Sequence, residues 1–275
     1  MHMKSRRALQ LVCALAAASA CAAAMALDLP PANGQFDYQI GGAYAPLSTV
    51  QIVDRDRSDP PVAGKYNICY VNTFQAQQDD AAWWKANHND LLLKNASGAY
   101  VKDPGWNEIL LDTSTAAKRA ALLAIIGGWI DGCGTAGFQA IEPDNLDSWT
   151  RSKKLLTADD NIAFASLLAQ RAHADNLAIA QKNVSEIAAQ GVSQVHFDFA
   201  IAEECQANTD DSGDHPECDT YISYYGSQVY EIEYSGDGLA NYNAACAARG
   251  ARISIIYRDI DVVPSDDPAY IYKWC

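Results

Sequence analysis

The chain has few basic residues. It contains 20 Lys and Arg against 34 Asp and Glu, which gives a formal net charge of −14 over 275 residues. So acidic a surface repels phosphate backbones and anionic lipid headgroups, so we expect no nucleic acid and no stable membrane partner. It favours solubility or a cationic partner. After residue 26 no segment is apolar for long enough to span a bilayer.

Common metal and nucleotide signatures are also missing. No C-x-x-C pair or Cys/His spacing typical of zinc occurs, and the acidic run 210–214 lacks the full calcium-loop pattern. No G-x-G-x-x-G follows the first predicted strand, which argues against a dinucleotide site. We therefore expect neither a metal nor a cofactor.

The first 26 residues have the layout of a secretory signal peptide. Basic residues precede an alanine-rich apolar run, which ends in Ala24-Met25-Ala26, an A-x-A cleavage site. We predict a signal peptide over 1–26 and one secreted or periplasmic domain over 27–275. A retained membrane anchor, a twin-arginine signal and a lipoprotein acceptor at Cys21 are weaker alternatives, the last because the usual leucine before the cysteine is missing.

Six cysteines follow this leader, an even number that suggests up to three disulfides in an oxidising compartment. They are Cys69, Cys133, Cys205, Cys218, Cys246 and Cys275. The sequence does not choose among the pairings. We favour Cys205–Cys218, which would close an Asp/Gly-rich loop, and Cys246–Cys275, which would tie down the C-terminus.

Alternating strand and helix patterns predict the fold. The expected strands are 36–40, 66–71, 109–112, the start of 137–147, 177–183, 195–200, 228–234 and 253–257. The expected helices are 79–93, 115–130, 159–174, 185–189 and 239–249. Strand–helix alternation in about 250 residues predicts a single-domain α/β protein, a (β/α)8 TIM barrel. An open doubly wound sheet is the alternative.

Polar residues gather where these strands end. The stretch 137–147 begins as an apolar strand and ends in Glu142, Asp144, Asn145 and Asp147. Other predicted strand ends carry Asp37, Gln39, Asn72, Lys182, Asn183, Asp198, Glu203, Glu233, Arg258 and Asp259. In a barrel the C-terminal strand ends converge on one face, where active sites lie. We therefore predict these residues to contact a substrate there.

Carboxylates beside aromatic side chains suit a sugar, whose hydroxyls bind acceptors while its ring faces stack. The nearby aromatics are Tyr38, Tyr44, Trp149, Phe199, Tyr234 and Tyr257, of which we predict Tyr44 and Tyr234 to contact substrate. Glycoside cleavage needs two carboxyl groups of opposite role. Asp144 and Glu203 come from different strand ends and could face each other across a cleft. Lys182 is a candidate partner for a neighbouring carboxylate.

Several motifs follow one another in a recognisable order. They are F36-D-Y-Q-I-G-G42, Cys69-Tyr70, W106-x-E-x-x-L-D112, G137-F-x-A-I-E-P-D-N145, Lys182-Asn183, F197-D-F-A-I-x-E-E-C205 and Glu233-Tyr234. Together they resemble glycoside hydrolase family 114, the endo-α-1,4-polygalactosaminidases, over nearly the whole chain after the leader. The resemblance implies a (β/α)8 barrel and endo-hydrolysis of an α-1,4-linked galactosamine polymer, wholly or partly deacetylated.

The resemblance also implies two acidic catalytic residues, which fall on Asp144 and Glu203. We predict Asp144 as nucleophile and Glu203 as general acid/base of a retaining mechanism, with Glu204 as the alternative acid. The sequence departs from the family pattern at Ala202, where Asn is preferred, and at Gln139, where Asp is common. The first departure bears on how Glu203 is positioned.

A deacetylated galactosamine polymer carries ammonium groups, so an anionic cleft would attract it. A cationic amino-sugar polysaccharide is therefore the expected partner. Two alternatives stay open: a non-catalytic exported carbohydrate-binding barrel, and an α-glycosidase of the same fold with another substrate.

Overall fold

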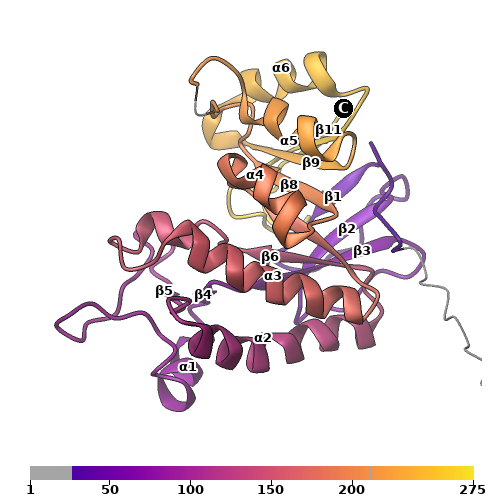
Figure 1. Cartoon of the computed structure of the whole chain (residues 1–275). Helices are drawn as coiled ribbons and strands as arrows, with labels where there is room; N and C mark the ends of the chain where they lie inside the picture. The colour runs from indigo at the N-terminus through magenta and orange to yellow at the C-terminus, as the bar shows by residue number, and fades with distance from the viewer. Residues whose placement is uncertain (1–26, 211) are drawn as a thin grey trace, which may run out of the picture.

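The computed structural model describes residues 27–210 and 212–275. The predicted signal peptide lies outside these residues, so the division at residue 26 stays a prediction. The described chain folds into a nine-stranded sheet with helices packed around it and a small two-stranded sheet beside it (Figure 1).

The nine-stranded sheet has the order β1-β2-β3-β6-β7-β8-β9-β10-β11. Its strands are β1 (Phe36–Tyr38), β2 (Ile52–Asp56), β3 (Tyr66–Asn72), β6 (Ala140–Asp144), β7 (Ala178–Lys182), β8 (Phe199–Glu203), β9 (Val229–Tyr234), β10 (Ser254–Arg258) and β11 (Tyr272–Trp274). All neighbours pair in parallel except β11, which is antiparallel to β10. The predicted α/β barrel is confirmed.

Side chains close the seam between β10 and β1. The Ser254 hydroxyl donates to the Gly34 carbonyl at 2.7 Å, and the Arg258 guanidinium donates to the Tyr38 carbonyl. Tyr272 on β11 donates its hydroxyl to the Phe36 carbonyl at 2.9 Å. The first and last strands of the sheet are thereby linked.

Helices cover the outside of the sheet. They are α1 (Ala81–Asn87), α2 (Ala116–Ala136), α3 (Ala158–Ala174), α4 (Ala188–Gln190), α5 (Glu217–Tyr225) and α6 (Leu239–Arg249), with short turns η1 (Ser148–Arg151), η2 (Ser185–Ile187), η3 (Gly191–Val195) and η4 (Ser235–Asp237). In Figure 1, α2 and α3 lie side by side below β3 and β6, whereas α5 and α6 lie against β9.

The two long helices are fixed by local sequence signals. Thr115 caps α2 by accepting from the Lys118 amide, and Gly137 ends it with a φ of 101°, which a residue with a Cβ rarely adopts. Thr157 and Asp160 form a reciprocal capping box at the start of α3. These signals fix the ends of the helices that precede and follow β6 in the chain, and β6 carries Asp144 at its end.

Two strand predictions are wrong. The segment 109–112 does not join the barrel: Ile109–Leu110 forms β5, which pairs with β4 (Gln75–Ala76) in a separate two-stranded sheet. The barrel position is taken by β2, which the strand pattern did not predict because three of its five residues are charged. The sequence therefore predicted the correct number of parallel strands, eight, but it counted 109–112 in place of β2.

The predicted strand 195–200 is also displaced. Gly191–Val195 is a π-helical turn, His196 has a φ of 67°, and β8 begins only at Phe199. Apolar residues alternate continuously across this break, so the pattern alone could not locate it. Neither α5 nor β11 was anticipated.

Three disulfides form among the six cysteines. The pairs Cys205–Cys218 and Cys246–Cys275 are confirmed, and Cys69 on β3 is bonded to Cys133 on α2.

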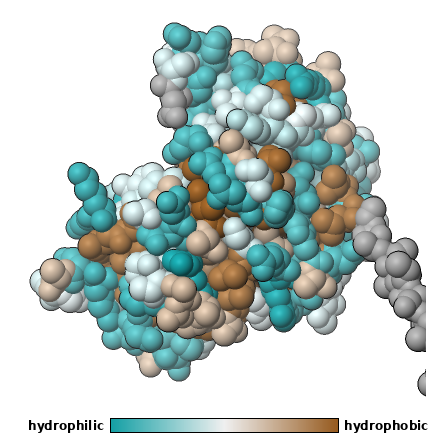
Figure 2. All heavy atoms as spheres, in the orientation of Figure 1, coloured by the Kyte–Doolittle hydropathy of each residue, from teal (hydrophilic) through white to brown (hydrophobic). Residues whose placement is uncertain are grey.

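Figure 2 shows one face of the molecule, mainly hydrophilic, with hydrophobic residues in separate small groups. Within residues 27–210 and 212–275, no helix has the length and hydropathy needed to cross a bilayer.

Candidate active site

A cleft of about 530 Å³ opens at the C-terminal ends of the barrel strands. Its lining includes Tyr70, Asp103, Trp106, Glu108, Asp144, Asn145, Asp147, Arg151, Lys182, Asn183, Glu203, Glu204 and Tyr234. Seven of the residues predicted from strand ends therefore lie together in it. This is the face on which barrel enzymes carry their active sites.

Strand alternation explains how β6 delivers its carboxylates. Ala140 packs in the barrel interior, so Glu142 and Asp144, two and four residues later, point to the same side. Glu142 is level with Tyr70 of β3, and Asp144 is level with Asn72. Glu142 is fully buried beneath the cleft, and its contact with substrate stays a prediction.

Lys182 connects the buried layer to the cleft. Its Nζ lies 2.6 Å from Glu142 Oε1, 3.2 Å from Glu203 Oε2 and 3.6 Å from Asp144 Oδ1. Burial opposes the charge of the ammonium, but the carboxylates of Glu142, Glu203 and Asp144 outweigh it and raise the pKa of Lys182 well above its ordinary value. A permanent cation therefore lies between the two predicted catalytic acids.

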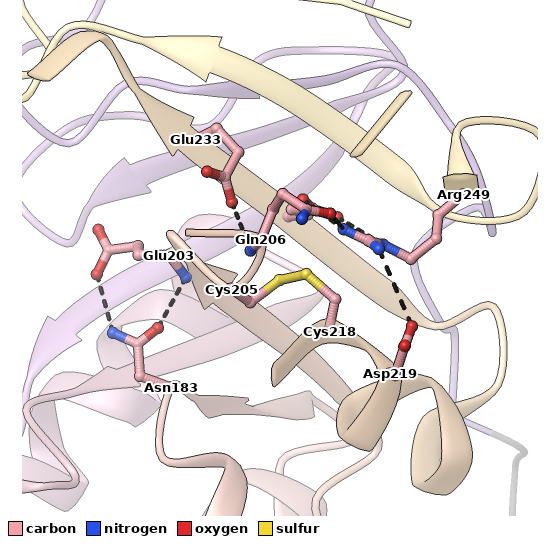
Figure 3. Close-up of a disulfide and its surroundings, with 9 residues drawn as sticks. Asn183, Glu203, Cys205, Gln206, Cys218, Asp219, Glu233 and Arg249 are labelled. Atoms are coloured by element: carbon pink, nitrogen blue, oxygen red, sulfur yellow. Dashed lines mark hydrogen bonds and ion pairs between the residues drawn. A yellow bond between two sulfur atoms is a disulfide. The ribbon is translucent and has the colours of Figure 1, made fainter. Parts of the chain in front are cut away.

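Glu203 is held by two further donors. The Asn183 side chain donates to Oε2 at 2.9 Å and accepts from the Glu203 amide at 2.8 Å, as Figure 3 shows. The Tyr234 hydroxyl donates to Oε1 at 2.5 Å. Burial, and then the Glu203 charge, raise the pKa of the Tyr234 phenol well above its usual range, so Tyr234 stays a donor.

Asp144 has a matching set of partners. The Tyr70 hydroxyl donates to Oδ2 at 2.7 Å, and the Asn145 amide donates to the same oxygen at 3.1 Å. Each acid is thus held by one phenol and one amide, and both share Lys182. Such pre-oriented groups are what catalysis at a carboxylate requires.

The far side of the cleft is formed by the segment between β3 and α2, residues 73–115. It carries Asp103, Glu108 and Trp106, whose indole is 54 % exposed. Asn72 donates to Glu108 at 2.8 Å. Burial raises the pKa of Glu108 to about 7, with the negative charge of Asp144 adding to it.

Arg151 on η1 organises this side. It donates to Asp147 Oδ2 at 2.6 Å and to Asn145 Oδ1 at 2.8 Å, and it forms an ion pair with Asp103. Sequence reasoning missed Arg151, although it follows the E-P-D-N stretch within one loop. It also missed Asp103. Tyr70, Trp106 and Glu108 had entered only as parts of the family motifs and were given no role, although Tyr70 precedes Asn72 by two positions and so shares its side of β3.

Five predicted residues lie outside the cleft lining, in a polar network beside the β1–β10 seam. They are Asp37, Gln39, Tyr44, Arg258 and Asp259. Tyr44 donates its hydroxyl to Asp37 Oδ1 at 2.6 Å, and Gln39 donates to Oδ2 at 2.8 Å. These groups bind mainly to one another, outside the cleft lining, and their contact with substrate stays a prediction.

Two further acids point elsewhere. Asp198 precedes β8 and therefore lies at the opposite end of the barrel, where it accepts from the Ile179 amide at 2.9 Å. Glu233 faces outward, because Ile232 and Tyr234 occupy the inward positions of β9. In Figure 3 it accepts from the Gln206 amide, at 2.9 Å, away from Glu203.

Several residues at the rim have left-handed backbone conformations. Asn145, Asn183, Val184 and Glu204 have φ values of 67°, 53°, 65° and 56°. Asn tolerates this region, whereas valine and glutamate adopt it at a cost. Such strain gathers at functional sites. Here it turns the chain immediately after the strands that carry Asp144, Lys182 and Glu203.

Glu204 also borders the cleft. Burial and a hydrogen bond shared with Asp237 raise the pKa of its carboxyl to about 7. Glu203, in contrast, contacts Lys182, Asn183 and Tyr234.

Among the described residues, one group of three side chains has metal-ligand spacing, Cys205, Cys218 and Glu231, but its cysteines form a disulfide and supply no thiolate.

The sequence profile of glycoside-hydrolase family GH114 matches residues 16–275. The chain belongs to this family. This GH114 protein is therefore a glycoside hydrolase, and the paired carboxylates at the strand ends are consistent with that class. No curated protein sequence matches it significantly.

Two solved structures share the fold of the GH114 protein. Ega3 from Aspergillus fumigatus, determined in complex with galactosamine, has a TM-score of 0.68 and 23 % identity, covering 91 % of this chain and 98 % of Ega3. The glycoside hydrolase domain of PelA from Pseudomonas aeruginosa has a TM-score of 0.58 and 18 % identity, covering 84 % of this chain and 96 % of that domain.

Proposed function

We propose that this GH114 protein is an exported endo-hydrolase of α-1,4-linked galactosamine polymers, fully or partly deacetylated. The carrying observation is that Asp144 and Glu203 line one open cleft and that both carboxylates lie within ion-pair distance of Lys182 Nζ. The galactosamine complex of Ega3, which has the same fold, supports the choice of sugar.

The charge of the cleft supports a cationic substrate. Its lining includes Asp103, Glu108, Asp144, Asp147, Glu203 and Glu204, whereas Lys182 and Arg151 are its cations. Both cations are already paired with carboxylates. The remaining negative charge is suited to the ammonium groups of deacetylated units. Trp106 offers an exposed ring on which a sugar face can stack.

We further propose a retaining mechanism. Because Lys182 Nζ lies 3.6 Å from Asp144 Oδ1 and 3.2 Å from Glu203 Oε2, these oxygens are no farther apart than the sum of the two distances. This bound, which concerns the two oxygens nearest Lys182, is compatible with the separation of about 5–5.5 Å between the carboxyl groups of retaining enzymes.

In this mechanism Asp144 attacks the anomeric carbon while Glu203 gives its proton to the departing glycosidic oxygen. A covalent glycosyl–Asp144 ester results. Glu203 then takes a proton from water, whose oxygen attacks the anomeric carbon and releases Asp144. Tyr70 and Asn145 orient the nucleophile, and Tyr234 and Asn183 orient the acid.

Export is part of the proposal. The three disulfides support an oxidising compartment, since such bonds are rare where thiols are kept reduced. The leader-like sequence of residues 1–26 points the same way.

The test is release of soluble oligosaccharides from polymeric galactosamine. Asp144→Asn and Glu203→Gln should each lower kcat by a factor on the order of 10³ or more, because each removes a group that takes part in bond making or breaking. Binding of the polymer should persist in both variants.

Glu204→Gln is the matched control, since it neutralises the neighbouring carboxyl and should leave turnover nearly intact. If Glu204→Gln is inactive and Glu203→Gln is active, the acid has been assigned wrongly. If the wild type binds the polymer without cutting it, or cuts only neutral α-glycans, the proposed substrate is wrong. The anomeric form of the first product, followed by NMR, separates retention from inversion.

A further inference from the structure

Two carboxyl groups are enclosed in the barrel interior below the cleft. Asp54 on β2 and Glu142 on β6 have no exposed surface. Neither oxygen of Asp54 accepts a hydrogen bond from an N–H or O–H donor in the described chain, and the same holds for Glu142 Oε2. An isolated buried carboxylate is strongly disfavoured, so this arrangement requires an explanation.

The donors that reach Glu142 serve one oxygen only. Tyr38 donates its hydroxyl to Oε1 at 2.9 Å, and Lys182 donates to the same atom at 2.6 Å. Asp54 is the neighbouring carboxyl: the two groups are near enough to interact through a side-chain hydrogen bond, but none forms from an N–H or an alcohol donor. Two ionised carboxylates have no proton to share, so one of the two must be protonated.

The surroundings decide which carboxyl holds the proton. Burial, and then the charge of Glu142, raise the pKa of Asp54 well above its usual range; Asp144 adds to this and Lys182 opposes it. Burial raises the pKa of Glu142 as well, but the Lys182 ammonium, which contacts Glu142 directly, opposes that rise. Tyr38, level with Asp54 on β1, is already committed to Glu142. The neutral acid is therefore Asp54.

We propose that Asp54 is a positioning residue of the active site: as a neutral acid it donates to Glu142 Oε2 and thereby holds Lys182 Nζ between Asp144 and Glu203. The proposal rests on the proposed function in so far as Asp144 and Glu203 are the catalytic pair. An ionised Asp54 would draw the ammonium down toward two buried negative charges and away from the cleft.

Two substitutions at Asp54 separate its proton from its shape. Asp54→Asn keeps a donor toward Glu142 but cannot titrate. Asp54→Val has a similar volume and no donor. We expect Asp54→Asn to keep kcat within about threefold of wild type, and Asp54→Val to lower kcat by about tenfold or more with KM little changed. The activity of Asp54→Asn should also extend to higher pH, because the wild type loses the shared proton there.

Infrared difference spectroscopy of the full chain tests the protonation without any turnover. At neutral pH the wild type should show the C=O band of a buried neutral carboxyl that is missing in Asp54→Asn. Identical spectra, equal losses of activity in the two variants, or wild-type kinetics in Asp54→Val would each overturn the proposal. If the wild type fails to cut galactosamine polymers, the proposed function fails, while the infrared band still decides the state of Asp54.

Discussion

At the scale of single residues, the two predicted catalytic acids are held by equivalent but separate sets of donors. Tyr70 serves Asp144 and Tyr234 serves Glu203, and both phenols are buried. Each phenol fixes the orientation of its carboxyl group. The two tyrosines therefore allow each acid to be perturbed alone.

Tyr234→Phe should lower kcat by roughly ten- to a hundredfold, since a hydrogen bond to a charged group contributes about 1.5–3 kcal/mol. Tyr70→Phe is the matched variant and should lower kcat by a similar factor, since it removes the corresponding donor to Asp144. A wild-type kcat in either variant would contradict the assigned roles.

The residue scale also shows what sequence reasoning can reach. Asp144, Lys182 and Glu203 were located because each ends a recognisable strand. Asp54 could not be located in this way, because an aspartate next to an arginine is typical of an exposed loop. Only the structure shows that it is buried and that burial raises its pKa. Glu142 was assigned to substrate because pattern alone does not say how deep along a strand the cleft begins.

At the scale of elements, side chains along β9 alternate between the cleft and the layer of helices outside the barrel. Tyr234 faces the cleft, whereas Glu233 faces the layer that contains the Cys205–Cys218 disulfide (Figure 3). Gln206, which donates to Glu233, also accepts from Arg249 at 2.6 Å. This network holds the loop that directly follows Glu203.

Glu233→Gln should leave KM unchanged but alter the pH dependence of stability. Burial raises the pKa of Glu233 from 4.5 to about 8, so the folded state binds the proton more tightly and loses stability as pH rises between these values. The variant lacks this loss. Its Tm should match wild type near pH 4.5 and exceed it above pH 8.

Glu186→Gln, at an exposed glutamate, is the control and should show no such difference. A rise in KM for Glu233→Gln would restore the sequence-based prediction that Glu233 contacts substrate.

The success and the failure of fold prediction can both be traced to particular strands. The strand–helix alternation was sufficient to predict the barrel, because the apolar strands 66–71, 177–183, 228–234 and 253–257 dominate the pattern. It failed where a strand is charged, as in β2, and where an apolar segment pairs outside the barrel, as in β5. The chain after β1 turns toward the seam, so its polar residues Gln39 and Tyr44 lie there and not in the cleft. The strand pattern does not predict the direction of such a turn.

At the scale of the whole molecule, negative charge favours capture of a polycation. Hydrolysis of a deacetylated polymer should slow as salt rises, because the Debye length falls from about 10 Å at 0.1 M to about 3 Å at 1 M. The loss should appear in kcat/KM, measured at low substrate concentration. A fully acetylated polymer is the matched control and should respond little; equal salt effects on both would rule out steering by charge.

The closing strand has a further consequence, for the order of folding. β11 pairs with β10 and reaches β1 through Tyr272, and its neighbour Cys275 is bonded to Cys246 of α6. These residues are synthesised after all the other strands, so a growing chain holds its first strand without the segment that joins it to the last. Contacts of such long sequence separation form slowly. The seam is therefore the last part of the barrel to form, and unfolding should begin there.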